Sequence, residues 1–143
     1  MEGKINFVRP GDLYVPEGNT VGAKTIANWL GNDIQYSCSS LEEWMVVFSE
    51  IGDGRREGGY LGTGNSHSVM AVSNVIYIEC EYNESRKVLM TIAQATCALQ
   101  EYKEFLGSDC KSRLDKIDHF HIEYEAEGDA ALEQYLEMGG EFG

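Results

Sequence analysis

Two histidines separated by one residue are the side chains in this sequence that most resemble a metal or acid/base pair. His119 and His121 flank Phe120, so in a strand both imidazoles point to one face, about 6–7 Å apart. Glu123 and Glu125 continue this face and could share a metal with them. The same spacing is common on solvated strand edges. We predict no metal and no cofactor, and keep a small metal-dependent enzyme using His119 and His121 as an alternative.

The remaining nucleophiles and acids lack the neighbours that catalysis requires. The sequence has no Gly-x-Ser-x-Gly elbow, and no cysteine lies beside a histidine. His67 follows a glycine-rich stretch and precedes a strand, which is compatible with an active site but more typical of a polar loop residue. Paired acids such as Glu42 and Glu43 are not in the apolar surroundings that raise a carboxyl pKa. We predict that the protein is not an enzyme.

The cysteines and the apolar runs bear on location. Cys38, Cys80, Cys97 and Cys110 form no Cys-x-x-Cys pair, and no histidine is placed to complete a zinc quartet. No apolar run reaches the roughly 20 residues of a membrane helix, and the N-terminus lacks the apolar core of a signal peptide. These features predict reduced cysteines, a cytoplasmic location and no membrane association. Two disulfides in a secreted protein would fit the even cysteine count but lack an export signal.

The chain is strongly acidic and its charge is uneven. Its 143 residues include 24 Asp and Glu against 11 Lys and Arg, a formal net charge of −13. Nucleic acid and anionic lipid repel such a surface, so we predict no direct binding to either and expect a basic partner. The last 27 residues hold eight acids and no lysine or arginine, and Glu79, Glu81 and Glu84 form a second cluster. One explanation of these acids is that they keep the protein soluble. The other is that they recognise a basic partner, because several of them lie beside tyrosines.

Hydrophobic patterning predicts one α+β domain that spans residues 1–143. Alternating apolar residues predict strands at 4–8, 34–38, 67–72, 75–82, 86–90 and 120–124. Spacing of three and four predicts helices at 20–30, 40–51, 91–106 and 129–136, and six glycines predict a loop at 52–64. Because most strands follow one another as hairpins, we expect a single mainly antiparallel sheet with three to four helices packed on it.

Polar residues and glycines mark the predicted helix ends. Ser40 and Thr91 each begin a capping-box spacing, and Asp129 is expected to cap the last helix. Gly31 is expected to follow the end of the first helix. Residues 73–74, a Ser-Asn pair, are expected to form the turn of the clearest hairpin.

One part of the chain resembles a known family. The segments at 60–69 (YLGTGNSHSV), 74–79 (NVIYIE), 81–84 (EYNE) and 99–106 (LQEYKEFL) are similar to small bacterial immunity proteins of polymorphic and contact-dependent toxin systems. In that family a Gly-x-Gly-Asn-Ser segment leads into a hairpin, an acidic turn and a helix ending in Glu-Tyr/Trp-Lys-Glu-Phe-Leu. The matching residues are structural rather than catalytic. The resemblance implies a cytosolic, non-enzymatic protein that binds and neutralises one cognate toxin domain, often a nuclease.

The acidic clusters and the resemblance together predict an immunity protein that binds the basic C-terminal domain of a toxin, expected to be a nuclease. The expected toxin-binding residues lie on the wet faces of the hairpin and the last strand: Tyr77, Glu79, Glu81, Glu84, Asp118, Glu123 and Glu125. The alternative with the same physical cause is an acidic mimic of nucleic acid, such as an anti-restriction or anti-defence protein. Such a mimic would bind several unrelated DNA-binding proteins.

Overall fold

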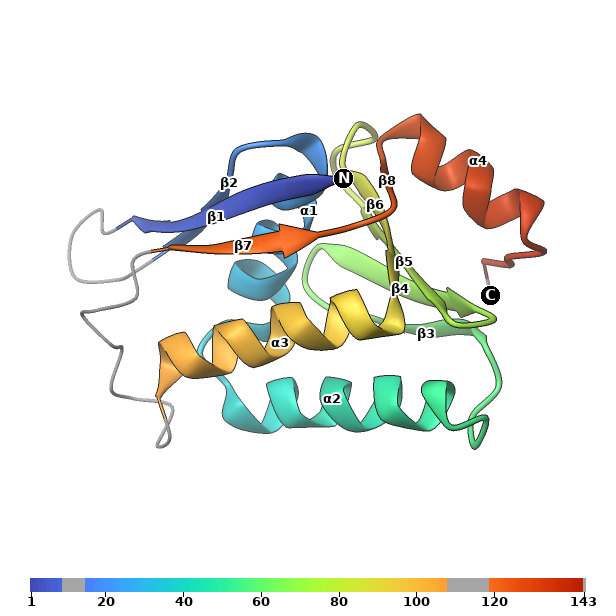
Figure 1. Ribbon diagram of the computed structural model, residues 1–143, viewed down its shortest axis with the longest axis horizontal. Coiled ribbons are helices and arrows are strands. Elements are labelled where there is room, and N and C mark those ends of the chain that lie inside the picture. Colours follow the sequence, from blue (N-terminus) through green and yellow to red (C-terminus); the bar gives the residue numbers. More distant parts are fainter. Residues whose placement is uncertain (9–14, 108–118, 143) are drawn as a thin grey trace.

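Two antiparallel sheets and four α-helices make up the described part of the chain (Figure 1). The computed structural model describes residues 1–8, 15–107 and 119–142. The strands are β1 (Glu2–Val8), β2 (Val15–Gly18), β3 (Gly59–Thr63), β4 (His67–Val72), β5 (Val75–Cys80), β6 (Lys87–Thr91), β7 (His119–Glu123) and β8 (Ala126–Glu127). The helices are α1 (Val21–Asn28), α2 (Cys38–Gly52), α3 (Ile92–Leu106) and α4 (Asp129–Glu137), and a π-helical turn, η1 (Trp29–Ile34), follows α1.

The strands form a three-stranded sheet A, in the order β2-β1-β7, and a five-stranded sheet B, in the order β3-β4-β5-β6-β8. One stretch of chain joins them, because Glu123 pairs with Glu2 in sheet A and Ala126 pairs with Leu89 in sheet B. The α+β class is confirmed, whereas the prediction of a single sheet is wrong. Strand β7, which corresponds to the predicted strand at 120–124, pairs with the N-terminal strand β1. Local patterning cannot show a pairing between segments so far apart in the sequence.

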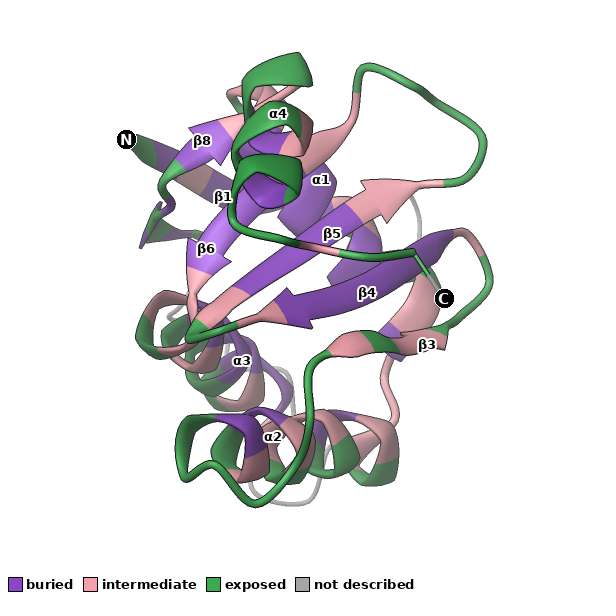
Figure 2. Cartoon of the chain, turned by 90° about the vertical axis from the view of Figure 1, so that its right-hand side faces the viewer, coloured by how far each residue is buried: buried purple, intermediate pink, exposed green. Residues whose placement is uncertain are grey.

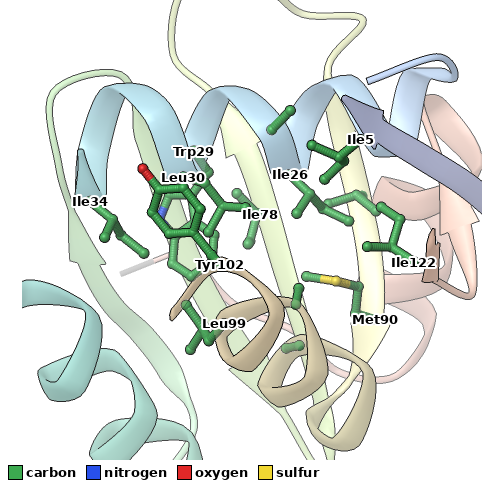
Figure 3. Close-up of a cluster of buried hydrophobic side chains, with 14 of the residues drawn as sticks. Ile5, Ile26, Trp29, Leu30, Ile34, Ile78, Met90, Leu99, Tyr102 and Ile122 are labelled. Carbon is green, nitrogen blue, oxygen red and sulfur yellow. The ribbon is translucent and has the colours of Figure 1, made fainter. Parts of the chain in front are cut away.

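Sheet B is buried on both faces, and this decides which side chains remain available to a partner. Helices α1, α2 and α3 cover one face with a large apolar core, in which Ile26, Ile78 and Leu99 lie close together (Figure 3). Helix α4 and the segment after it lie across the opposite face (Figure 2), where a second cluster contains Tyr77 and Tyr135. Alternate side chains of a central strand therefore point into two different cores.

The hairpin and the third helix are confirmed almost residue by residue. Strands β4 and β5 meet at the predicted turn, and Ser73 supplies its positive φ of 50°. The Thr91 side chain accepts from the Gln94 backbone N–H, and the Gln94 side chain accepts from the Thr91 N–H, which completes the capping box of α3. Gly107 ends this helix with a φ of 84°. These features succeed because neighbouring residues alone determine them.

The segment between α1 and α2 differs from the prediction. The chain does not leave the helix at Gly31 but continues through η1, and no strand forms at 34–38. Ser37, not Ser40, is the N-cap of α2, since its Oγ accepts from the Ser40 N–H at 3.1 Å. Gln35 closes η1 with φ 60° and ψ −135°, a backbone region that costs about 1–3 kcal/mol outside glycine. The alternation of apolar residues there arises from a tightly folded connection, not from a strand.

Two other local predictions are wrong. Residues 59–63 of the predicted glycine-rich loop form the edge strand β3, whose pairing with β4 contains an irregularity between Tyr60 and Gly62. Asp129 is the first residue of α4 rather than its cap; Gly128 occupies the cap position, with no side-chain hydrogen bond.

The cysteines are not all reduced, contrary to the prediction. Cys38 is disulfide-bonded, whereas Cys80 and Cys97 are free, and Cys110 lies outside the described residues. Cysteine spacing alone does not show which thiols meet in space. Disulfides persist mainly in oxidising compartments, so this feature does not favour the expected cytoplasmic location. Among the described helices, none combines the length and apolarity that a transmembrane span requires.

Candidate functional site

The predicted hairpin acids lie at one end of the outer side of sheet B, which we call the hairpin face. It is defined by Tyr60, Thr63, Ser68, Glu79, Glu81, Tyr82 and Glu84, from β3, β4, β5 and the loop after β5. Figure 2 shows this loop as an exposed extension beyond the end of β5, while the C-terminal segment crosses in front of β5 itself. Glu81, Tyr82 and Glu84 are exposed, so this end of the hairpin face is open to a partner.

A chain of hydrogen bonds holds Glu81 in place on the hairpin face. Ser68 Oγ donates to Glu81 Oε1 and lies 2.9 Å from Thr63 Oγ1, which also contacts the Tyr60 hydroxyl. Ser68 itself is buried, whereas Glu81 is exposed. A carboxylate fixed by a buried hydroxyl loses little side-chain entropy when a cation binds to it. The face thus presents a preorganised negative charge.

Tyr82 is the most exposed large aromatic side chain of the described residues, with 82% of its surface accessible. It lies in the loop between Glu81 and Glu84. Asn83 Oδ1 accepts hydrogen bonds from the Ser85 N–H and Oγ and so stabilises this loop. Tyrosine is enriched among the few residues that contribute most of the binding energy at protein interfaces. The sequence analysis noted tyrosines beside the acids, but it included only the acids of this loop, not Tyr82, among the expected toxin-binding residues.

Tyr77 does not belong to the open surface. Its side chain is fully buried and stacks on Tyr135 of α4, with ring centroids 4.8 Å apart. Phe142 packs nearly perpendicular to both rings, and the Tyr77 hydroxyl donates to Glu79 Oε2 at 2.9 Å. The interpretation of this strand face as wet is therefore wrong at Tyr77, because α4 covers it. Glu79 remains half-buried at the margin of the covered area.

Replacing Tyr77 with phenylalanine is expected to make alkaline unfolding less steep. Burial, and then the Glu79 carboxylate, raise the pKa of Tyr77 well above its ordinary value near 10, so the folded state keeps a proton that the unfolded chain loses. This stabilisation is complete below pH 10 and is lost as the pH rises beyond it. Urea unfolding at pH 8 and pH 11 should show a smaller fall in midpoint for Tyr77→Phe than for the wild type. Equal falls would contradict the assignment.

A second acidic region is a cleft of about 410 Å³ between β7 and α3. We call it the acidic cleft and define it by Glu2, Glu101, His121 and Glu123. Glu2 and Glu123 lie directly opposite each other in the β1–β7 pair. Like charges in that position repel, and a cation bound between them would relieve the repulsion. Neither Glu2 nor Glu101 was singled out from the sequence, because only the tertiary fold brings them together.

The two histidines of β7 lie as the alternation predicts. Both are exposed on one face, and their ring centroids are 5.8 Å apart. Across the described residues, however, no group of three or more His, Cys, Asp or Glu side chains is arranged to hold a metal ion. Neighbouring Glu123 and Glu125 thus do not complete a site with His119 and His121 in this structure.

The predicted toxin-binding residues divide between two regions. Glu79, Glu81 and Glu84 gather on sheet B, whereas Glu123 belongs to sheet A and lines the acidic cleft. Glu125 is exposed between the sheets, and the predicted Asp118 lies outside the described residues. The hairpin and the last strand therefore do not form one continuous wet face.

The Gly-Asn-Ser-His segment of the family resemblance encloses a buried carboxylate, Asp33. The Asp33 side chain is 2% exposed and accepts from the backbone N–H groups of Ser66 and His67 at 3.2 and 2.9 Å. It also accepts from Ser66 Oγ at 2.9 Å and His67 Nδ1 at 3.1 Å. Gly64 passes so close that an added Cβ would lie 2.5 Å from Asp33 Oδ2. This segment fixes the start of the hairpin onto η1.

Comparison of the chain with protein-family models, with curated proteins and with solved structures found no match.

Proposed function

We propose that this protein is an immunity protein that binds and neutralises a basic toxin domain, with the hairpin face as its main contact. The observation that carries the proposal is the exposed Tyr82 between Glu81 and Glu84, next to a carboxylate that buried Ser68 holds in place. An aromatic anchor among fixed anions suits an arginine- or lysine-rich surface, such as the phosphate-binding surface of a nuclease. The resemblance of residues 60–106 to immunity proteins supports the same class.

The acidic cleft is proposed as a secondary, peripheral contact. Its carboxylates are exposed, and they lie on sheet A and helix α3 rather than on sheet B with the hairpin acids. Exposed rim charges mainly accelerate association and contribute little to the lifetime of a complex. Together the two regions would attract a basic domain and orient it toward the hairpin face.

The proposed function is tested with the toxin encoded next to this protein, because an immunity gene lies directly downstream of its toxin gene. The C-terminal domain of that toxin is co-expressed with the tagged full chain, and an unrelated basic toxin domain serves as control. We expect a stoichiometric complex and protected growth with the cognate domain alone. Binding to both domains and to unrelated DNA-binding proteins would instead identify a nucleic-acid mimic. Binding to none of them would reject both functions.

A further inference from the structure

Among the buried side-chain nitrogen and oxygen atoms of the described residues, Nε2 of His67 has no hydrogen-bond partner. The His67 side chain is completely buried, and its Nδ1 lies 3.1 Å from Asp33 Oδ1. Nδ1 also lies 2.8 Å from Ser66 Oγ, whose single proton is donated to Asp33 Oδ1. Both neighbours of Nδ1 therefore accept from it, which assigns the proton to Nδ1 and leaves Nε2 with an unused lone pair. His67 is thus oriented as a proton acceptor, in the manner of a histidine whose other nitrogen is held by a carboxylate.

The residue opposite His67 in the sheet is a free thiol. His67 and Cys80 are paired across β4 and β5, so their side chains project from the same face. The Glu81 N–H bonds to Ser66 O at 2.7 Å, while the Cys80 N–H turns away to Arg86 O at 3.0 Å. This pattern identifies His67 and Cys80 as a non-hydrogen-bonded pair, in which the Cβ atoms are roughly 4.5–5.5 Å apart.

Cys80 also remains accessible to small molecules, since its side chain is only partly buried. Its thiol is not hydrogen-bonded to Nε2 in this structure, and rotation about the Cα–Cβ bond is the movement that would redirect it. The cross-strand pairing thus places a donor beside a buried acceptor that needs one. Cys97 offers the natural comparison, because it is free and more exposed and lies on α3 in another part of the fold.

We propose that Cys80 is a reactive thiol, activated by the Asp33–His67 pair, and that small electrophiles modify the protein there. The Cys80 proton passes to His67 Nε2, and Asp33 stabilises the resulting imidazolium. The thiolate then attacks the electrophile. With iodoacetamide, an S–C bond forms, the C–I bond breaks, iodide leaves with the bonding electrons, and the imidazolium returns its proton to solvent. Cys80 and His67 project from the opposite face of sheet B to Ser68 and Glu79, so this site does not rest on the proposed toxin contact.

The test is native alkylation of the full chain with iodoacetamide at neutral pH, followed over time by mass spectrometry of Cys80 and Cys97 peptides. Activation by a neighbouring base predicts that Cys80 reacts at least about tenfold faster than Cys97, although it is less exposed. Equal or slower reaction of Cys80 would overturn the proposal.

Two variants separate activation from simple exposure. In His67→Gln the Cys80 rate is expected to fall about tenfold or more, with the Cys97 rate unchanged as an internal control for folding. Asp33→Asn keeps the imidazole in place but removes the negative charge that stabilises the imidazolium. The alkylation rate of Cys80 should therefore lie between those of the wild type and His67→Gln. If His67→Gln fails to fold, Asp33→Asn alone decides. Rapid labelling of Cys80 that neither substitution slows would overturn the role of the pair.

Discussion

Replacing Asp33 with alanine is expected to lower the free energy of unfolding by about 3–5 kcal/mol. Asp33 is the common acceptor for four donors, the backbone N–H groups and polar side-chain atoms of Ser66 and His67. Its side chain is 2% exposed and that of His67 is completely buried, so water cannot readily replace the lost acceptor. Each buried donor left without a partner carries a desolvation penalty, which makes this loss larger than the removal of one hydrogen bond.

Matched substitutions identify the cause of the loss. Asp53→Ala removes a carboxylate whose partner is the exposed Arg55, and it should cost less than about 0.5 kcal/mol. Asp33→Asn keeps one carbonyl acceptor and should fall between the two. Urea unfolding followed by circular dichroism gives the three values. A loss for Asp33→Ala no greater than that for Asp53→Ala would mean that the Gly-Asn-Ser-His segment does not depend on Asp33.

The fold was predictable where neighbouring residues determine the structure. Helix α3 follows from the capping box at Thr91 and from its apolar spacing, and the β4–β5 hairpin follows from two apolar runs around a two-residue turn. The β1–β7 pairing was not predictable, because a strand's pattern gives its buried face but not its partner. The burial of Tyr77 was missed for a related reason: its cover, α4, is supplied by the distant C-terminal segment.

The candidate site, too, was predictable only where its residues are neighbours in the sequence. Glu81 and Glu84 could be named from the sequence because they are neighbours in one loop, and Tyr82 between them carried the same signal. The acidic cleft is different, since Glu2, Glu101 and Glu123 come from three distant segments. Asp33 was equally hidden, because an isolated acid in an acidic chain gives no sign that it is buried. Sequence patterns therefore locate contiguous surfaces, and clefts between elements require the structure.

Charge reversal on the hairpin face is expected to weaken toxin binding far more than charge reversal in the acidic cleft. Glu81→Lys replaces the carboxylate held by Ser68 with a cation and should raise the dissociation constant about 30-fold or more, equivalent to about 2 kcal/mol. Tyr82→Ala removes the exposed ring and should have a loss of similar size, as aromatic residues at interface centres do. Glu123→Lys changes a peripheral charge and should mainly slow association at low salt.

The measurement is binding kinetics between each variant and the cognate toxin domain at two salt concentrations, with Glu57→Lys as the control for a change in net charge. Glu57 is exposed in the connection between α2 and β3 and belongs to neither acidic region. Because Glu57→Lys, Glu81→Lys and Glu123→Lys alter the net charge equally, differences among them report position rather than overall attraction. If Glu123→Lys speeds dissociation and Glu81→Lys does not, the toxin binds the acidic cleft. If all three behave alike, the acids provide only long-range attraction, and the contact that holds the complex lies elsewhere on the surface.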